Sequence, residues 1–339
     1  MKNRIEAQFP LTTRCTYLNT AASGLLPASV LKFRQEHDLE FFEQGSKLRL
    51  KHNELIALTR EAVARLFCGK PSQVALVPSF SMGFNTLMDG VKPSSKFLLL
   101  KGDYPSVNWP VQSRNFETRY VDVSAQMEDD IAEAFKVEQP DVFAFSIVQY
   151  ISGIKMDLSF IQNLKKQYPE TLFFADGTQY CGTENFNFSD SGIDVLGASP
   201  YKWLNAGYGN GFLMFKEQVA NHVFPNTTGF NSITGKYKQQ DNNFIGKFEP
   251  GHQDTLNYGS LLKAIELVEY FSMDTIENTI KKLSQKARAR FEERGLLSKD
   301  VVNRKEHSSI FNINGDDALY QKLEQHNVAC IQRGDGIRV

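Results

Sequence analysis

Two side chains that could act together chemically follow two apolar runs in the middle of the chain. Asp176 comes directly after the run Thr171–Ala175, and Lys202 follows the run Val195–Ala198, 26 residues beyond Asp176. The glycine-rich segment Gly207–Gly211 comes next and permits close approach of its backbone. In an open parallel sheet, ligands bind beyond the carboxyl ends of the strands. If both runs are parallel strands, the carboxylate and the amine therefore meet at one edge of the sheet.

A carboxylate and a lysine at such an edge suit the chemistry of pyridoxal 5′-phosphate (PLP). The lysine amine can form a Schiff base with the aldehyde, and the carboxylate can keep the pyridine nitrogen protonated, so that the ring accepts electrons. Taken singly, each residue has an ordinary explanation, with Asp176 capping a loop and Lys202 exposed on the surface. The ordered combination of a strand ending in Asp, a strand followed by Ser-x-x-Lys and a glycine-rich strand favours the PLP site.

The elements that must position these residues alternate along the chain. Helical stretches, such as Asn53–Phe67 and Leu158–Gln167, separate short apolar runs. Continuous apolar runs are typical of strands buried on both faces. This order indicates an α/β fold with a mostly parallel, seven-stranded sheet sandwiched by helices. The expected strands are Val74–Val77, Lys96–Leu100, Thr118–Val121, Val142–Ile147, Thr171–Ala175, Val195–Ala198 and Gly211–Phe215.

The pattern changes after residue 225. A long polar loop is expected over Asn226–Gly251, followed by helices over 256–271 and 273–295. The segment SSIFNI then predicts a strand, 316–326 a helix and VACIQR another strand. We therefore expect a large α/β domain over residues 15–225 and a smaller α+β domain over 226–339 together with 1–14. The sequence stops at Val339 inside an expected strand, so the smaller domain is expected to be incomplete at its C-terminal end.

Composition excludes several classes of protein. Hydrophobic residues make up 41% and charged residues 23% of the 339 residues, which is typical of a folded globular chain and not of a disordered or coiled-coil one. A net charge of −1 argues against nucleic-acid binding, and no apolar run is long enough to cross a membrane. The N-terminus has no apolar core, so no signal peptide is expected. The four cysteines are widely separated, which indicates reduced thiols in a cytoplasmic protein and no metal site.

The central segments also resemble a known family. DGTQYCG and ASPYKWLNAGYGNGFLMF are similar to the centre of the class V aminotransferases, fold-type I PLP enzymes that include cysteine desulfurases, kynureninases and isopenicillin N epimerase-like proteins. The resemblance extends over nearly the whole chain, through YLNTAASGLLP, PSFSMGFN, DYPSVNWP, IVQYISG, KFEPGHQDT and DGIRV. It implies PLP as the cofactor, a homodimer with shared active sites, and a small amino acid as substrate, with a 2-oxo acid as a second partner.

The resemblance assigns roles around the cofactor ring. Lys202 would be the Schiff-base lysine and then the proton carrier at the substrate Cα, and Asp176 would pair with the pyridinium nitrogen. Gln179 would donate a hydrogen bond to the phenolic oxygen of the ring. Tyr104 would stack on the ring face, although an aromatic residue there is also compatible with a core position.

The phosphate is expected at the start of a helix, where N–H groups favour an anion. Ser81, through its hydroxyl and amide, and the amide of Met82 would bind it, together with the hydroxyl of Ser199. Tyr201 stands where the family often has His and can donate the same hydrogen bond. Thr255 would reach the phosphate from the other subunit, although both Ser81 and Thr255 could instead be helix caps.

Substrate contacts are expected from the two ends of the chain. Asn19 and Ala21 lie in the entry segment, and Tyr150 stands where desulfurases have Asn. Arg338 would bind the α-carboxylate as a two-pronged donor, although it could also be a surface strand residue. Desulfurases carry a nucleophilic Cys shortly before this Arg, but residues 331–337 contain none, and Cys330 falls in an apolar run.

The sequence leaves the reaction open. We expect an aminotransferase of the class V type, with a PLP-dependent Cβ-lyase, an epimerase or an inactive PLP-fold binding protein as alternatives. Ser199 and Lys202 also match the S-x-x-K of serine acyl-enzymes, but the accompanying SDN and KTG motifs are absent. Gly207–Gly211 lacks the helix start of a dinucleotide site.

Overall fold

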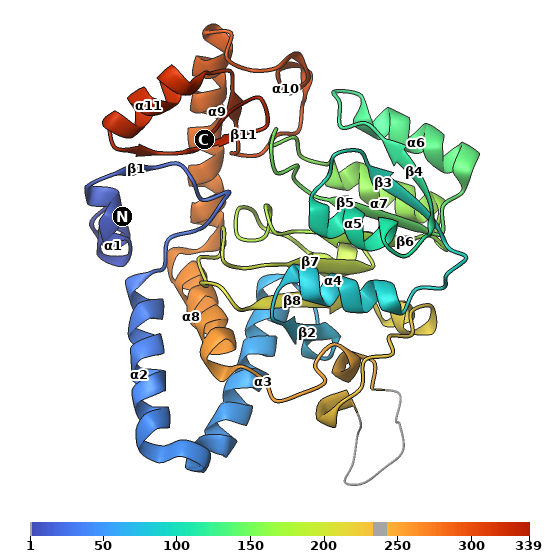
Figure 1. The fold of residues 1–339 in the computed structure, drawn as a ribbon, viewed down its shortest axis with the longest axis vertical. Helices are drawn as coiled ribbons and strands as arrows, with labels where there is room; N and C mark the ends of the chain where they lie inside the picture. Colours follow the sequence, from blue (N-terminus) through green and yellow to red (C-terminus); the bar gives the residue numbers. More distant parts are fainter. Residues whose placement is uncertain (1, 233–242) are drawn as a thin grey trace.

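The computed structural model describes residues 2–232 and 243–339, and its centre is a seven-stranded sheet (Figure 1). The strand order is β2-β8-β7-β6-β5-β3-β4. Strand β8 runs antiparallel to β2 and β7, and the other pairs are parallel, which confirms the expected mostly parallel sheet. The strands are β2 (Val74–Val77), β3 (Lys96–Leu100), β4 (Glu117–Val121), β5 (Val142–Ser146), β6 (Leu172–Asp176), β7 (Val195–Ala198) and β8 (Gly211–Phe215).

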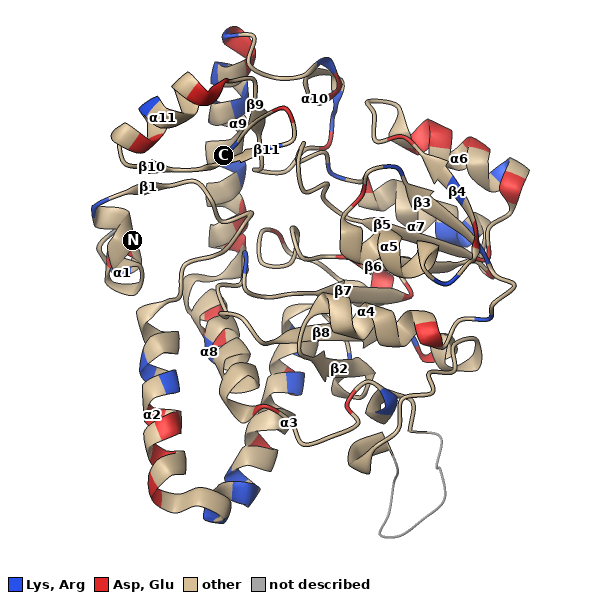
Figure 2. Cartoon of the chain, viewed as in Figure 1, with Lys and Arg blue, Asp and Glu red and all other residues tan. Residues whose placement is uncertain are grey.

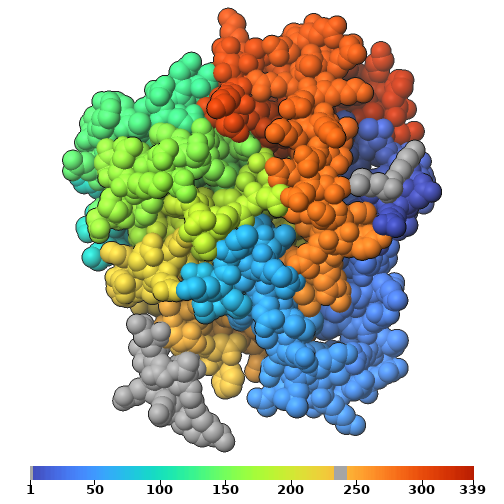
Figure 3. Space-filling view, turned by 180° about the vertical axis from the view of Figure 1, so that it is seen from behind, coloured from blue at the N-terminus to red at the C-terminus, as the bar shows by residue number. Residues whose placement is uncertain are grey.

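Helices cover both faces of the sheet and extend beyond it (Figure 1). Helix α8 packs against α2 and α3, and seen from behind α2 and α3 form one end of the molecule (Figure 3). The helices are α1 (Lys2–Gln8), α2 (Ala28–Gln44), α3 (Arg49–Leu66), α4 (Phe80–Asp89), α5 (Pro105–Gln112), α6 (Met127–Glu138), α7 (Leu158–Gln167), α8 (Thr255–Phe271), α9 (Met273–Glu293), α10 (Lys299–Asn303) and α11 (Asp317–Gln325).

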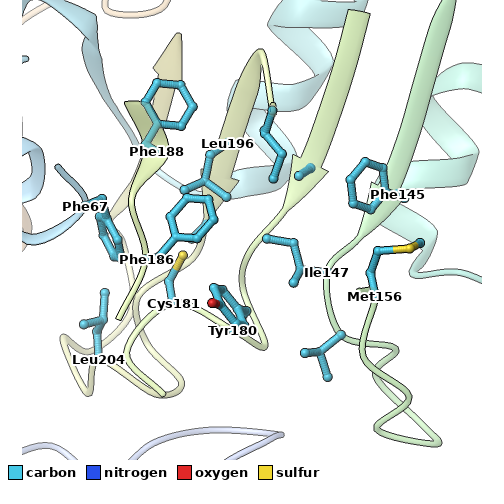
Figure 4. Close-up of a cluster of buried hydrophobic side chains, with 14 of the residues drawn as sticks. Phe67, Phe145, Ile147, Met156, Tyr180, Cys181, Phe186, Phe188, Leu196 and Leu204 are labelled. Carbon is cyan, nitrogen blue, oxygen red and sulfur yellow. The ribbon is translucent and has the colours of Figure 1, made fainter. Parts of the chain in front are cut away.

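Alternation along the strands builds a separate apolar core on each face of the sheet. On β5, Phe143 and Phe145 pack into one core, whereas Val142 and Ala144 pack into the other. Figure 4 shows part of the larger core, where Phe145 lies beside Met156, and Ile147 lies between them and Tyr180. Burial on both faces explains why these strands have continuous apolar sequences and could be located from them.

The C-terminal part forms a second, small sheet. Its strands β9 (Asn312–Ile313), β11 (Ile331–Arg333) and β12 (Gly336–Arg338) pair antiparallel in the order β11-β12-β9. Strand β10 (Val328–Ala329) instead pairs in parallel with β1 (Thr16–Tyr17). The expected strand VACIQR is therefore two strands in two sheets, and SSIFNI contributes only its last two residues. The domain boundary near residue 225 stays a prediction.

Two further features bear on the sequence expectations. The loop expected over Asn226–Gly251 contains two short 3-10 turns, Phe230–Ser232 and Ile245–Lys247, and its residues 233–242 lie outside the described residues. Charged side chains concentrate on outer helices such as α2, α6 and α11, whereas β7 and β8 carry none (Figure 2). No helix in the described ranges has the length and hydrophobicity needed to cross a bilayer.

Candidate active site

The parallel strands bring the predicted chemical groups to one edge of the large sheet. Asp176 is the last residue of β6, and Lys202 follows the neighbouring strand β7 by four residues. Tyr104 follows β3 and begins α5, and Tyr150 follows β5. These four side chains line a single narrow cleft, with a free volume of about 10 Å³, together with Ser146, Val148, Thr178 and Gln179.

Burial brings the ionisable groups of Asp176 and Lys202 toward neutrality. Each residue is only 5% exposed. Burial raises the pKa of Asp176 to about 6. Two neighbours act in the opposite direction and lower this pKa: the Thr178 backbone N–H, which donates to Oδ1 at 2.8 Å, and the positive charge of Lys202. Burial likewise lowers the pKa of Lys202 to about 8, and the positive charges of Arg338 and Arg333 lower it further. A buried acid and an amine with a lowered pKa are the groups that catalysis requires near neutral pH.

A second buried carboxylate, Asp103, stands beside this pair and was not predicted from the sequence. Its Oδ2 accepts the backbone N–H of Ser146 at 2.7 Å, and its Oδ1 accepts that of Tyr104 at 2.7 Å. Burial raises its pKa, and its charge adds to the raised pKa of Asp176. Asp103 therefore ties the start of α5, which carries Tyr104, to the end of β5.

Aromatic rings surround the Lys202 amine. Nζ lies 5.4 Å from the centroid of the Tyr104 ring and 5.7 Å from that of Tyr201. The Tyr150 ring meets Tyr104 edge-on, with centroids 5.2 Å apart, and the exposed Tyr208 stacks on Tyr201 at 4.6 Å. Burial raises the pKa of Tyr201 to about 12, so this phenol keeps its proton and can donate it in a hydrogen bond.

The start of α4 gathers hydroxyl groups, as predicted for a phosphate site. Ser79 caps the helix by accepting the Met82 N–H at 3.2 Å, so that amide is already used within the turn. The Phe80 N–H donates to Ser199 Oγ at 2.9 Å, which leaves the Ser199 proton available to an anion. Ser81 Oγ lies 2.7 Å from the hydroxyl of Ser106, which was not predicted, and the Ser81 amide belongs to the unpaired N–H groups of a first helical turn.

Gln179 is held in one orientation by two neighbours. Trp203 Nε1 donates to its Oε1 at 2.9 Å, and its Nε2 donates to the Ala21 carbonyl at 2.8 Å. A primary amide has two N–H donors, so one remains for a ligand. The entry segment thus contacts a residue of the cleft through the Ala21 carbonyl, and the Oδ1 of Asn19 in the same segment is buried without a hydrogen-bond partner among the described residues.

Arg338 reaches the cleft from the small sheet. It is 4% exposed, and its Nη1 donates to the Tyr150 carbonyl at 2.7 Å. Its Nε is buried with no hydrogen-bond partner in the described part of the chain. Burial lowers the pKa of this guanidinium. A buried donor without a partner lowers the stability of the folded protein, which is expected for a residue whose partner is an anionic ligand.

Thr255 lies apart from the other predicted residues. It is the first residue of α8, and its Oγ1 is 2.9 Å from His37 Nε2. The N-cap of that helix is Asp254, which accepts the Asn257 N–H. Thr255 lines a cleft of about 910 Å³ that includes His37 and His252 but none of the residues around Lys202. Within one chain, Thr255 therefore does not join the Lys202 site.

Comparison with known proteins identifies the family of the chain. Residues 16–338 match the family described as aminotransferase class V. The chain belongs to that family. It is also similar to the uncharacterized aminotransferase YcbU of Bacillus subtilis (strain 168), at 20% identity over 292 residues, which is 85% of this chain and 78% of YcbU.

Solved structures show the same fold. The apo cysteine desulfurase of Thermococcus onnurineus NA1 has a TM-score of 0.84 at 17% identity, covering 97% of this chain and 87% of that one. The cystine C–S lyase C-DES, solved with its product cysteine persulfide, has a TM-score of 0.84 at 21% identity, covering 98% and 94%. Another C-DES structure has glycine covalently linked to its PLP cofactor. These likenesses establish the fold-type I architecture of the class V enzymes.

The cofactor of this class V chain is PLP, and the donor set fits it. A buried acid suits the ring nitrogen, an amine of lowered pKa suits the aldehyde, and a helix start lined by serines suits the phosphate. Gly211 keeps that helix start close to β8, because a Cβ there would lie 2.9 Å from the Ser79 Cα. No group of three or more His, Cys, Asp or Glu side chains in the described ranges is arranged to hold a metal ion.

Proposed function

We propose that the protein is a PLP-dependent aminotransferase that moves the amino group of a small amino acid to a 2-oxo acid. The observation that carries this proposal is the convergence of Asp176 and Lys202 in one buried cleft, with pKa values of about 6 and about 8. The class V family and the aminotransferase relative support the same reaction class.

The roles of the residues follow from their positions. Bound PLP withdraws the electrons left at the substrate Cα when its proton is removed. Asp176 keeps the pyridine nitrogen protonated, because a buried carboxylate is stabilised by a cationic partner. Lys202 binds the cofactor aldehyde and afterwards moves the proton at the substrate Cα, a task suited to an amine whose pKa lies near 8. Tyr104, anchored by Asp103, covers one face of the ring.

The remaining predicted residues position the two ends of the bound molecules. Ser81 and Ser199 bind the phosphate at the start of α4, with Tyr201 as a further donor, and Gln179 donates to the phenolic oxygen. Arg338 binds the substrate α-carboxylate with its unpartnered Nε among the donors. Asn19, Ala21 and Tyr150 border the substrate.

A desulfurase that works through a loop thiol is the least compatible member of the family. Cys330 is 7% exposed between β10 and β11, and burial raises the pKa of its thiol. A protonated, buried thiol is a poor nucleophile. A lyase or an epimerase would use the same Lys202 and Asp176, so only the products separate these reactions from amino transfer.

We further propose a homodimer in which each active site uses both chains. Large apolar side chains are exposed at the end formed by α2 and α3, where Phe42 is 87% and Leu50 is 83% exposed (Figure 3). Exposed apolar surface of this kind marks an interaction site. The cleft that contains Thr255 lies beside this end, which would allow Thr255 to face the partner's phosphate.

Product analysis tests the reaction. The PLP-loaded protein would be incubated with a panel of amino acids, with and without pyruvate or 2-oxoglutarate, and the products identified by mass spectrometry and chiral chromatography. Amino transfer predicts a new amino acid only when both substrates are present, and none with Lys202→Ala. Release of ammonia without an acceptor would indicate a lyase, and appearance of the opposite enantiomer an epimerase. No change in any amino acid would indicate a binding protein.

A further inference from the structure

Two arginines project from the same face of the C-terminal hairpin. In the pairing of β11 with β12, Ile331 lies opposite Arg338 and Arg333 lies opposite Gly336. Cross-strand partners share a face, and so do residues two apart on one strand, which places Arg333 and Arg338 on one side. Diagonal neighbours of this kind have their Cβ atoms about 7–8 Å apart.

Both guanidinium groups contact Tyr150, one of the residues that line the Lys202 cleft. Arg338 Nη1 donates to the Tyr150 carbonyl at 2.7 Å, and the guanidinium carbon of Arg333 lies 5.3 Å from the centroid of the Tyr150 ring. The Tyr150 ring in turn contacts Tyr104, whose ring faces the Lys202 amine. The two arginines therefore lie next to the Tyr150 side of the Lys202 cleft.

These two arginines, the exposed Arg333 and the buried Arg338, differ from arginines elsewhere in the chain that pair with carboxylates. Arg304 pairs with Glu128, and Arg60 pairs with Glu249. In the part of the chain that the structure describes, neither Arg333 nor Arg338 forms an ion pair with a carboxylate. The charge of Arg333 contributes to the lowered pKa of Arg338, after burial as the main cause. Two like charges held close together without a carboxylate form a site that an anionic ligand would stabilise.

We propose that Arg333 and Arg338 together bind two anionic groups of one substrate, so that the preferred substrate is an amino acid with an acidic side chain. This inference rests on the proposed function, in which Arg338 takes the α-carboxylate. Arg333 takes the carboxylate of the side chain. Its guanidinium is exposed on the Tyr150 ring, so it can turn to an anion without breaking an ion pair. The planar fork of arginine matches a carboxylate with two parallel hydrogen bonds.

Binding of unreactive carboxylates tests the site without turnover. Succinate and glutarate carry two carboxylates but no amino group, and butyrate and valerate are their one-carboxylate counterparts. We expect calorimetry on the PLP-loaded protein to show the dicarboxylates binding about tenfold more tightly, the scale of one charged hydrogen-bonded pair. Arg333→Gln should bring that ratio near one, and Arg333→Lys should restore part of it. Arg294→Gln, at an exposed arginine beyond α9, is the matched control and should keep the wild-type ratio.

Two results would overturn the inference. The first is a wild-type protein that binds dicarboxylates no better than monocarboxylates. The second is an Arg333→Gln protein that loses affinity for both classes equally, as expected if Arg333 only supports Tyr150. Failure of the proposed function would give a different result. A protein that prefers dicarboxylates but transfers no amino group would support the two-anion site and contradict the aminotransferase. Amino transfer without a preference for dicarboxylates would support the aminotransferase and contradict the two-anion site.

Discussion

The two sides of the Lys202 cleft are built in different ways. On the sheet side, each oxygen of Asp103 accepts a backbone N–H, and an oxygen of Asp176 accepts another, so main-chain groups in and next to the large sheet position both carboxylates. On the hairpin side, among the described residues, the Arg338 side chain forms one hydrogen bond, whereas the Arg333 side chain forms none and contacts the Tyr150 ring. Strands β11 and β12 have three residues each. The cofactor side is therefore organised by the fold itself, whereas the substrate side depends on a ligand to complete its interactions.

This contrast predicts where substitutions act. Changes on the sheet side should abolish cofactor chemistry or alter stability, because those groups are buried. Changes on the hairpin side should alter the choice of substrate while the cofactor stays bound.

Lys202→Ala should have the largest effect. Without this amine, PLP has no covalent attachment and the Cα proton has no carrier, so turnover should fall by at least about a thousandfold, within the range of general acid–base contributions. The visible absorption of the PLP-loaded protein should also be lost. Lys101→Ala, at an exposed lysine paired with Asp122, should keep both properties. Borohydride reduction that fixes PLP to another lysine would contradict the role of Lys202.

Asp176→Asn should slow turnover while PLP still binds. The amide cannot hold a proton at the pyridine nitrogen, and loss of one buried electrostatic partner costs about 3 kcal/mol, or roughly a hundredfold in rate. The Thr178 N–H keeps its acceptor, because the asparagine carbonyl oxygen can replace Oδ1. Single-turnover kinetics at saturating PLP would measure the effect, and a mutant with near wild-type rate would show that Asp176 does not serve the ring.

Asp176→Asn should also stabilise the PLP-free protein. Burial raises the folded-state pKa of Asp176 from 3.8 to about 6, so the folded state holds the proton more tightly. This contribution to stability is present below pH 3.8 and is lost as the pH rises to about 6, by up to about 3 kcal/mol. Denaturation of PLP-free Asp176→Asn between pH 4 and 8 should therefore lack this loss and show a higher stability above about pH 6. Equal stabilities of wild type and mutant at that pH would contradict the assigned burial cost.

Asp103→Asn should weaken cofactor binding and stability together. An asparagine offers one acceptor oxygen, so the N–H of Ser146 or that of Tyr104 must lose its partner. A buried donor left unpaired costs about 1–3 kcal/mol, which predicts a lower melting temperature and PLP affinity reduced by about tenfold. Asp122→Asn, at an exposed carboxylate, is the control and should change neither. An unchanged affinity in a destabilised protein would assign Asp103 to the fold alone.

The sheet side is also what the sequence predicts best. The apolar runs located all seven strands to within one or two residues, because strands buried on both faces have continuous apolar sequences. Asp176 and Lys202 could then be placed at one edge, since the ends of parallel strands meet there. Asp103 was missed because an acid in a loop has no distinctive spacing. Its role depends on the Ser146 N–H, 43 residues away in the sequence.

The hairpin side was predicted less well, for a related reason. VACIQR is one continuous run, but its first half pairs with β1 and its second half with β12, and only the tertiary partners separate the two. Arg333 is exposed and unremarkable in sequence, and only the register with Arg338 shows that the two share a face. Helix α2 was not predicted, because exposed apolar residues such as Phe42 obscure its apolar stripe.

A mixed dimer tests the smallest and most specific expectation, that Thr255 serves the partner's site. One chain would carry Lys202→Ala and the other Thr255→Ala, with different affinity tags to isolate the mixed species. If sites are shared, one site carries both lesions and the other carries neither, so the mixed dimer should keep about half of the wild-type activity. If Thr255 serves its own chain, the intact Lys202 shares its site with the Thr255 lesion, and activity stays at half that of the Thr255→Ala dimer.

The contrast between these outcomes depends on how much Thr255→Ala alone reduces PLP affinity. The Thr255 hydroxyl pairs with His37, so a phosphate must replace this contact. Asp254 places a negative charge at the same helix start, and this charge repels a phosphate. We therefore expect a loss of only a fewfold, best measured at limiting PLP. His37→Ala frees the hydroxyl and should raise PLP affinity slightly in the dimer. A monomer that binds PLP fully at micromolar concentration would reject the shared site.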